Sequence, residues 1–169
     1  MEVAIGYHVE YVLKILIEAS WRNRRHMLLE REDIAQTRAA FLDNPVPVVV
    51  GSMPNIQFLN QFCTIRMATA RGSGHTTSLM SVSRLFVKPI VLFPNVAMAD
   101  HVLKRSLVMN ADGMYLSVRQ LDQARGVDYD AILVDCSFLL SPKEMDDIKM
   151  MCLAGLPAHP ERFCLVLVG

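Results

Sequence analysis

The sequence predicts an α/β protein in which a mainly parallel sheet is flanked by helices and preceded by a helical segment. Past residue 45, short apolar runs that favour β-structure alternate with helical runs, as in a sheet built from strand–helix–strand units. Residues 131–134 and 164–168 are continuously apolar, which is typical of strands buried on both faces. Residues 1–44 carry no strand pattern.

The N-terminal segment is expected to form two helices. Val9, Leu13 and Ile17 recur at helical spacing, and a second helical run covers residues 21–41. Proline cannot continue helical hydrogen bonding, and it disfavours helix in the residue before it. The prolines at 45 and 47 therefore place a boundary between an N-terminal helical segment, 1–44, and an α/β domain, 45–169.

Positive charge is concentrated on this segment. We interpret it as a solvated helix face, with a nucleic-acid patch as the alternative. The arginines concerned are Arg22, Arg24, Arg25 and Arg31, and acidic residues follow them.

The α/β domain is expected to contain five strands and three helices in alternation. The strands are predicted at 65–70, 89–93, 114–118, 130–135 and 163–168, and the helices at 76–86, 97–108 and 142–152. In parallel sheets, ligands bind at the carboxyl ends of the strands. Residues 69–76 and Asp135 are therefore predicted to meet at one edge of the sheet.

Composition narrows the class of protein. Lys and Arg together number 17, as do Asp and Glu, so net charge gives no argument for a polyanionic partner. The cysteines lack the spacing of a disulfide frame or zinc site, and we expect reduced, buried thiols; they are Cys63, Cys136, Cys152 and Cys164. No apolar run approaches the ~20 residues of a membrane helix. We expect a soluble, cytoplasmic protein without membrane contact.

Residues 69–76 resemble a phosphate-binding loop, whose usual pattern is G-x-x-x-x-G-K-[ST]. Thr69 stands where the first glycine belongs, Gly74 fits the second, His75 takes the lysine position and Thr76 supplies the hydroxyl. Gly72 and Gly74 would let the backbone wrap closely around a phosphate at a helix N-terminus.

Asp135 follows an apolar strand, a position from which a carboxylate can hold magnesium beside the threonine of a phosphate loop. Taken alone, an aspartate at a strand end also serves as a turn former or helix cap. Its coincidence with the glycine-bearing loop favours the metal role, with Thr76 as its companion.

Several segments in order resemble one family. Gln57 lies in a segment similar to the adenine-reading glutamine motif, residues 70–77 read ARGSGHTT, and residues 124–135 read ARGVDYDAILVD. Over residues 54–169 the chain resembles the ATPase domain of phage terminase large subunits and, more broadly, helicase-like P-loop enzymes.

The resemblance implies a P-loop NTPase fold of the RecA and terminase type that takes ATP and magnesium. It implies metal ligation by Thr76 and Asp135, with Asp135 and Arg71 as catalytic residues. The nucleotide-binding residues that it implies are Gln57, Arg71, Gly72, Ser73, Gly74, His75, Thr76 and Thr77. Its implied partners are double-stranded DNA and other subunits of a viral DNA-packaging machine, in an oligomer or complex within the host-cell cytoplasm or nucleus.

Two departures from the family pattern affect hydrolysis. His75 replaces the lysine that would hold the terminal phosphates, and Cys136 replaces the glutamate that would orient the attacking water. An imidazole is shorter than a lysine side chain and, at pH values above its ordinary pKa of ~6.5, largely neutral. A thiol is a poor general base for orienting water. We expect either a weakened ATPase or a catalytically inactive relative that acts as a binding or assembly subunit.

Four further side chains leave alternatives open. Arg71 either senses the terminal phosphate or is a solvated loop residue, and Arg125 either fixes a turn or contacts a ligand. Glu144 and Asp146 either replace the missing base or belong to a solvated helix face. No metal site is expected beyond the nucleotide-linked magnesium.

Overall fold

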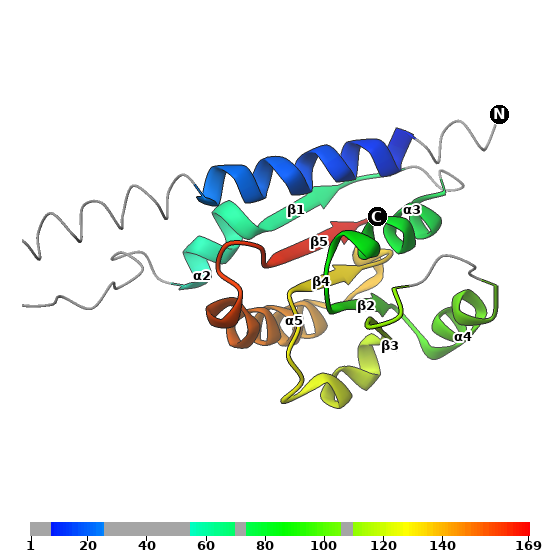
Figure 1. The fold of residues 1–169 in the computed structure, drawn as a ribbon. Coiled ribbons are helices and arrows are strands. Elements are labelled where there is room, and N and C mark those ends of the chain that lie inside the picture. The colour runs from blue at the N-terminus through cyan, green and yellow to red at the C-terminus, as the bar shows by residue number, and fades with distance from the viewer. Residues whose placement is uncertain (1–7, 26–54, 70–73, 106–109) are drawn as a thin grey trace, which may run out of the picture.

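The strands form one five-stranded sheet in which all neighbours are parallel, in the order β1-β5-β4-β2-β3 (Figure 1). The computed structural model describes residues 8–25, 55–69, 74–105 and 110–169. The strands are β1 (Thr64–Met67), β2 (Pro89–Phe93), β3 (Met114–Ser117), β4 (Ala131–Val134) and β5 (Cys164–Val168). The predicted α/β class with a parallel sheet is confirmed.

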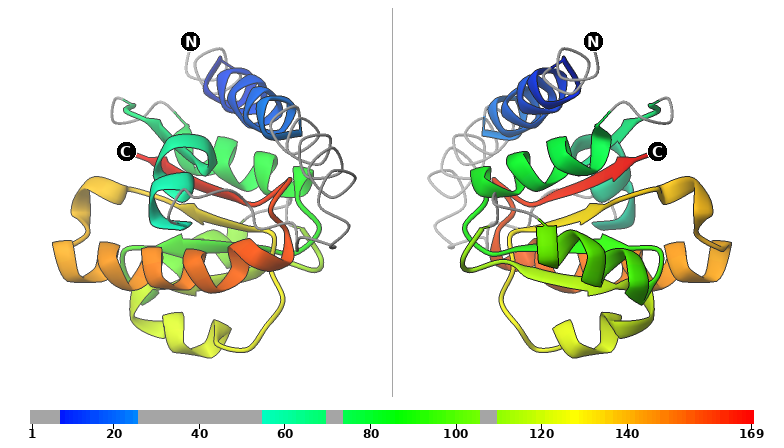
Figure 2. Two further views of the ribbon diagram at one scale, coloured as in Figure 1. Left: turned by 90° about the vertical axis from the view of Figure 1, so that its left-hand side faces the viewer. Right: turned by 90° about the vertical axis from the view of Figure 1, so that its right-hand side faces the viewer.

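Helices cover both faces of the sheet, as Figure 2 shows in two views. The helix of residues 8–25, α3 (His75–Val82) and α4 (Val96–Arg105) share a core with one face. On the other face lie α2 (Asn55–Phe58), α5 (Pro142–Gly155) and the 3-10 turn Val118–Ala124. Because β2, β4 and β5 are buried on both sides, alternate residues enter different cores. In β4, Leu133 faces the first core and Ile132 the second.

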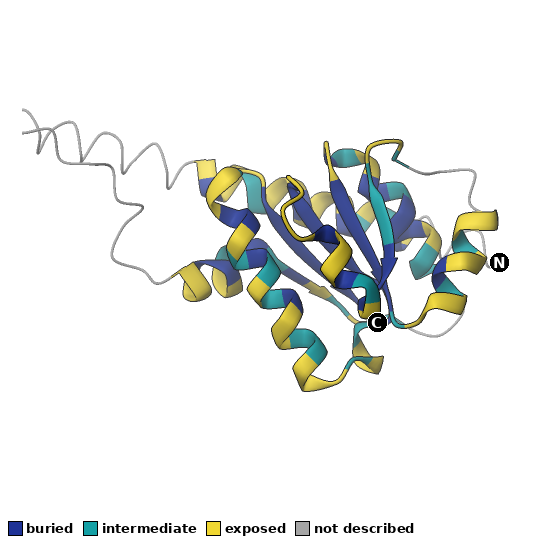
Figure 3. Cartoon of the chain, turned by 90° about the horizontal axis from the view of Figure 1, so that it is seen from below, coloured by how far each residue is buried: buried dark blue, intermediate teal, exposed yellow. Residues whose placement is uncertain are grey.

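The strands and helices agree with the predicted spans to within a few residues. In Figure 3 the central strands β2, β4 and β5 are buried, whereas the edge strands β1 and β3 are partly accessible and many exposed residues lie on the outer sides of the helices. The last predicted helix is extended to Gly155 and begins with a capping box, in which Ser141 and Glu144 satisfy each other's backbone N–H groups. This geometry gives Glu144 a structural role at the helix start.

The N-terminal segment differs from its prediction. The expected break before a second helix at Trp21 is wrong, because residues 8–25 form one continuous helix. Its apolar side places Val9, Leu13 and Ile17 in the core with β5 residues. The rest of the second predicted helix and the predicted boundary at residues 44 and 45 lie outside the described residues.

Arg24 corrects the interpretation of the arginine group as solvated. Its side chain is fully buried, and its guanidinium donates to the carbonyls of Pro160 and Phe163. It also lies 3.3 Å from the sulfur atoms of both Cys63 and Cys164. Arg22 and Arg25 are exposed, as predicted, whereas Arg31 lies outside the described residues.

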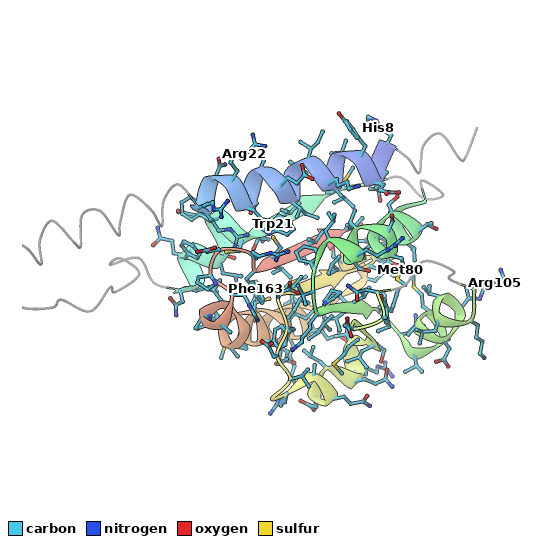
Figure 4. All side chains as sticks on the ribbon, viewed as in Figure 1. His8, Trp21, Arg22, Met80, Arg105 and Phe163 are labelled. Carbon is cyan, nitrogen blue, oxygen red and sulfur yellow. The ribbon has the colours of Figure 1, made fainter. Side chains whose placement is uncertain are left out.

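Trp21 adds a second anchor between this helix and the α/β domain. Its indole Nε1 donates to the carbonyl of Arg162 at 2.6 Å, and its ring meets Phe86 edge to face. Figure 4 shows Trp21 on the side of the helix that faces the sheet, whereas Arg22 points away. Among the described helices, none has the length and apolar character needed to cross a membrane.

The four cysteines are free, buried thiols, as the sequence predicts. Burial raises the pKa of Cys63 to about 11, although the nearby Arg24 opposes this shift. Burial likewise raises the pKa of Cys152 and of Cys164. In the folded chain these thiols therefore hold their protons to higher pH than in the unfolded chain.

We expect the free energy of unfolding to fall as the pH rises above about 9, because the unfolded chain then loses thiol protons that the folded chain keeps. For Cys63 the ordinary value is 9.0 and the folded value about 11, so its contribution is complete below pH 9 and lost by about pH 11. Two pKa units correspond to at most about 2.7 kcal/mol. Urea unfolding at pH 8, 9 and 10 measures the effect. Cys63→Ala should show a shallower decline, and an equal decline in both proteins would contradict the assignment.

Candidate functional site

The candidate site lies where the carboxyl ends of β1 and β4 flank the end of β5 (Figure 1). The chain leaving β1 enters α3 on one face of the sheet, whereas the chain leaving β4 leads to α5 on the other. Connections that part in this way leave a crevice above the sheet, the usual ligand position in open α/β folds. Arg71, Gly72 and Ser73 fall in the part of the connection that is not described.

The backbone on both sides of the crevice is shaped by left-handed residues. Gly74, immediately before α3, has φ 72°, a conformation that glycine adopts without steric cost. Cys136, immediately after Asp135, has φ 50° and is the one non-glycine residue of the described chain with positive φ. That conformation turns the chain out of β4 into the 3-10 turn Ser137–Leu139.

Asp135 is the centre of the site. It has no solvent exposure, and the Thr76 hydroxyl donates to its Oδ2 at 2.8 Å. Burial raises the pKa of Asp135, and the Thr76 hydrogen bond and the adjacent His75 oppose that rise. The predicted convergence of Thr76 and Asp135 is thus present, across 59 residues of sequence.

His75 lies beside Thr76 at the start of α3 and directs Nε2 at two groups. Its Nε2 is 3.3 Å from Oδ1 of Asp135 and 3.4 Å from Sγ of Cys136. A Cys-His-Asp catalytic triad would use the two ring nitrogens separately, one for the thiol and the other for the carboxylate. Both partners meet the same nitrogen here, so the arrangement does not match a triad.

The end of β5 lies between the chain that leaves β1 and the chain that leaves β4. The Thr69 amide donates to the carbonyl of Gly169 at 2.7 Å, and the Gly169 amide donates to the carbonyl of Met67 at 3.0 Å. The Thr69 hydroxyl oxygen is buried, and no hydrogen-bond partner for it lies in the described segments. These bonds fix the position of Thr69, the first residue of the predicted phosphate loop.

The other predicted site residues lie elsewhere. Gln57 is exposed on α2, near the amino end of β1, whereas Asp135 lies at the carboxyl ends of the strands (Figure 1). The two residues are therefore at opposite ends of the strands. Thr77 is exposed on α3, and Arg125 is exposed and pairs with Asp122 beside the left-handed Gly126. Their predicted roles toward a ligand stay predictions.

Asp146 is exposed on α5 and pairs with Lys149, 3.5 Å away. Glu144, on the same helix, is engaged by Ser141 at its start. His159, a residue without metal-ligand spacing in the sequence, has Nε2 2.7 Å from Oδ1 of Asp128 at the other end of β4.

A large groove in the described structure lies away from this site. It has a volume of about 1110 Å³ and lies between α5 and the chain before β4, with Arg119, Tyr129 and Asp147 among its lining residues. Its charged side chains carry both signs and are mainly exposed. The crevice at Asp135 is the stronger candidate because its carboxylate is fully buried and lies beside three groups able to bind a ligand.

The relationship between His75 and Cys136 is not visible in the sequence, where they stand as two separate departures from the phosphate-loop pattern. In the structure a donor atom of each and one of Asp135 lie within 4.8 Å of one another. Metal-site motifs in sequences rely on short spacings, and residues 75 and 135 are too far apart to give that signal. They meet only because the carboxyl ends of β1 and β4 lie on either side of β5.

Comparison of the chain with protein-family models, curated proteins and solved structures finds no match.

Proposed function

We propose that the chain binds a nucleoside triphosphate with magnesium in the crevice at the carboxyl edge of the sheet, as a degenerate relative of terminase or helicase-like ATPase domains. The observation that carries the proposal is the 2.8 Å contact between the Thr76 hydroxyl and the Asp135 carboxylate. A hydroxyl at the start of a helix and an acidic residue after a neighbouring strand are the pair that P-loop enzymes use for magnesium.

The residues present fit magnesium at this point. Magnesium prefers oxygen ligands and commonly uses one or two protein groups together with nucleotide phosphates. Thr76 and Asp135 would hold the ion, which would neutralise charge on the bound phosphates. The N-terminus of α3 would face the phosphates with its unpaired N–H groups, and Gly74 provides the turn that leads into it.

Hydrolysis is expected to be weak. His75, at the lysine position, is occupied with Asp135 and Cys136 rather than extended towards the place of a terminal phosphate. Cys136 follows Asp135 with a thiol in place of a carboxylate, so the residue directly after Asp135 is not the usual base for orienting the attacking water. The same two contacts favour the second candidate, an inactive relative that acts as a binding or assembly subunit.

The wider role rests on the sequence resemblance alone. It comprises a place in a viral DNA-packaging machine, with double-stranded DNA and other subunits as partners.

Thermal unfolding with and without magnesium and ATP tests the proposal, because a ligand that binds only the folded state stabilises it. At ten times the dissociation constant the gain is about 1.4 kcal/mol, or a rise of roughly 3–6 °C in the midpoint. Thr76→Val should lower the affinity at least tenfold, because it removes the magnesium-side hydroxyl.

Thr64→Val is the matched control, since it also removes a threonine hydroxyl bond, to the carbonyl of Leu59 at the far end of β1. Its response to ATP should equal that of the native chain. No rise for the native chain at millimolar ATP would refute the proposal. A rise that Thr76→Val leaves unchanged would place the nucleotide elsewhere.

A further inference from the structure

The three donor groups around Nε2 of His75 form a chemically distinct set from the magnesium pair. They are an imidazole nitrogen, a thiol sulfur and a carboxylate oxygen, contributed by His75, Cys136 and Asp135. Magnesium takes oxygen ligands, whereas thiolate and imidazole are characteristic ligands of zinc and its first-row neighbours. The two residues that depart from the phosphate-loop pattern are therefore the two that supply soft donors.

The distances suit a tetrahedral ion. With zinc bonds of about 2.0 Å to nitrogen, 2.1 Å to oxygen and 2.3 Å to sulfur, neighbouring donor atoms lie roughly 3.4–3.6 Å apart. Nε2 of His75 is 3.3 Å from Oδ1 of Asp135 and 3.4 Å from Sγ of Cys136. The remaining pair, the sulfur of Cys136 and the carboxylate oxygen of Asp135, lies within 4.8 Å, so it needs an approach of at most about 1.2 Å.

A second observation concerns Oδ1 of Asp135. This oxygen belongs to a fully buried carboxylate and lies 3.3 Å from Nε2 of His75, and no described residue meets the criteria for a hydrogen bond to it. The backbone and thiol of Cys136 interact with the same carboxylate. A buried carboxylate oxygen without a well-formed hydrogen bond is costly, and a cation bound at that oxygen would offset the cost.

We propose that His75, Asp135 and Cys136 bind a zinc-class transition-metal ion through Nε2, a carboxylate oxygen and Sγ. Binding converts the Cys136 thiol to a thiolate and releases its proton to solvent, while His75 binds as a neutral ring with its proton on Nδ1. Three protein ligands leave one coordination position for water or another ligand, as in catalytic rather than structural zinc sites.

The inference does not depend on nucleotide binding. Asp135 belongs to both proposed sites, but Thr76 belongs only to the magnesium pair and Cys136 only to the transition-metal set. Substitutions at Thr76 and Cys136 therefore separate the two proposals.

Titration of the reduced full chain with Co²⁺, followed by competition with Zn²⁺, tests the site in buffer without magnesium or nucleotide. We expect one equivalent of Co²⁺ to bind with a thiolate-to-cobalt charge-transfer band, which Zn²⁺ abolishes. Cys136→Ser should lose the band, and His75→Gln should lower the affinity at least tenfold. Thr76→Val should keep the band, because it removes no ligand of this set, although the loss of its bond to Asp135 lowers the affinity.

Cys152→Ala is the control, because this thiol is fully buried on the opposite face of the sheet in the core with α5. It should retain the band, and circular dichroism of each variant checks the fold. Absence of a saturable band in the native chain would overturn the proposal, as would a band that persists in folded Cys136→Ser. Proton release is an independent measurement that does not require a strong Co²⁺ band. The native protein should release about one proton per Zn²⁺, and Cys136→Ser should not.

Discussion

His75→Lys is expected to raise the affinity for magnesium-ATP about ten- to a hundredfold. A lysine at the start of α3 would present a permanent positive charge to the terminal phosphates, and hydrogen bonds between charged groups contribute about 1.5–3 kcal/mol. In the native chain, Nε2 of the His75 imidazole already lies beside Asp135 and Cys136. The substitution restores the usual residue of the phosphate-loop pattern.

The same variant should lose the proposed transition-metal site, since an ammonium group has no lone pair for the metal. Titration with labelled ATP and titration with Co²⁺ therefore give opposite changes for one substitution. His101→Lys, on the exposed side of α4, adds the same charge away from the crevice and should change neither titration. Unchanged or weaker ATP binding by His75→Lys would mean that residue 75 does not face the phosphates.

Arg24→Ala is expected to lower the free energy of unfolding by about 2–4 kcal/mol. The substitution leaves a cavity where a large, fully buried side chain stood, and it removes the donors for the carbonyls of Pro160 and Phe163. It also removes one of the contacts between the helix of residues 8–25 and the chain that enters β5, while the bond from Trp21 to the carbonyl of Arg162 remains. None of the described carboxylates pairs with Arg24, and burying such a guanidinium is itself costly, which keeps the expected loss below the sum of its hydrogen bonds.

Urea unfolding followed by tryptophan fluorescence is a suitable measurement, because Trp21 lies one turn before Arg24 on the same helix. Arg22→Ala is the matched control, since Arg22 is exposed on that helix, and its effect should stay within about 0.5 kcal/mol. Equal effects of the two substitutions would show that the buried guanidinium does not stabilise the fold.

The sequence predicted the sheet well because its signals are local. The spans of β2, β4 and β5 are apolar runs bounded by polar or turn residues, so burial on both faces can be seen in the sequence. The predicted start of a second helix at Trp21 and the predicted solvent exposure of Arg24 were wrong. Trp21 has mixed character and Arg24 is charged, so neither residue looks like a buried anchor in the sequence. Their burial depends on the carbonyls of residues 160, 162 and 163, which no local pattern reveals.

The candidate site was predicted in part. Asp135 and Thr76 were paired from a general property of parallel sheets, that ligand-binding groups gather at the carboxyl ends of strands, and their contact is present. The convergence of His75 and Cys136 on Asp135 was not predicted, because each residue was compared only with the family pattern at its own position.

The sequence by itself determined which segments are buried strands, where the glycine-bearing turn lies and that an acidic residue follows β4, because each depends on neighbouring residues and hydrophobic periodicity. Only the tertiary structure decided which strands are adjacent. The order β1-β5-β4 brings residues 75, 76, 135 and 136 to one crevice. The chain that leads into β5 brings the carbonyl of Phe163 to the guanidinium of Arg24. The physical reason is that burial and coordination depend on atoms brought together by folding, which sequence spacing alone does not specify.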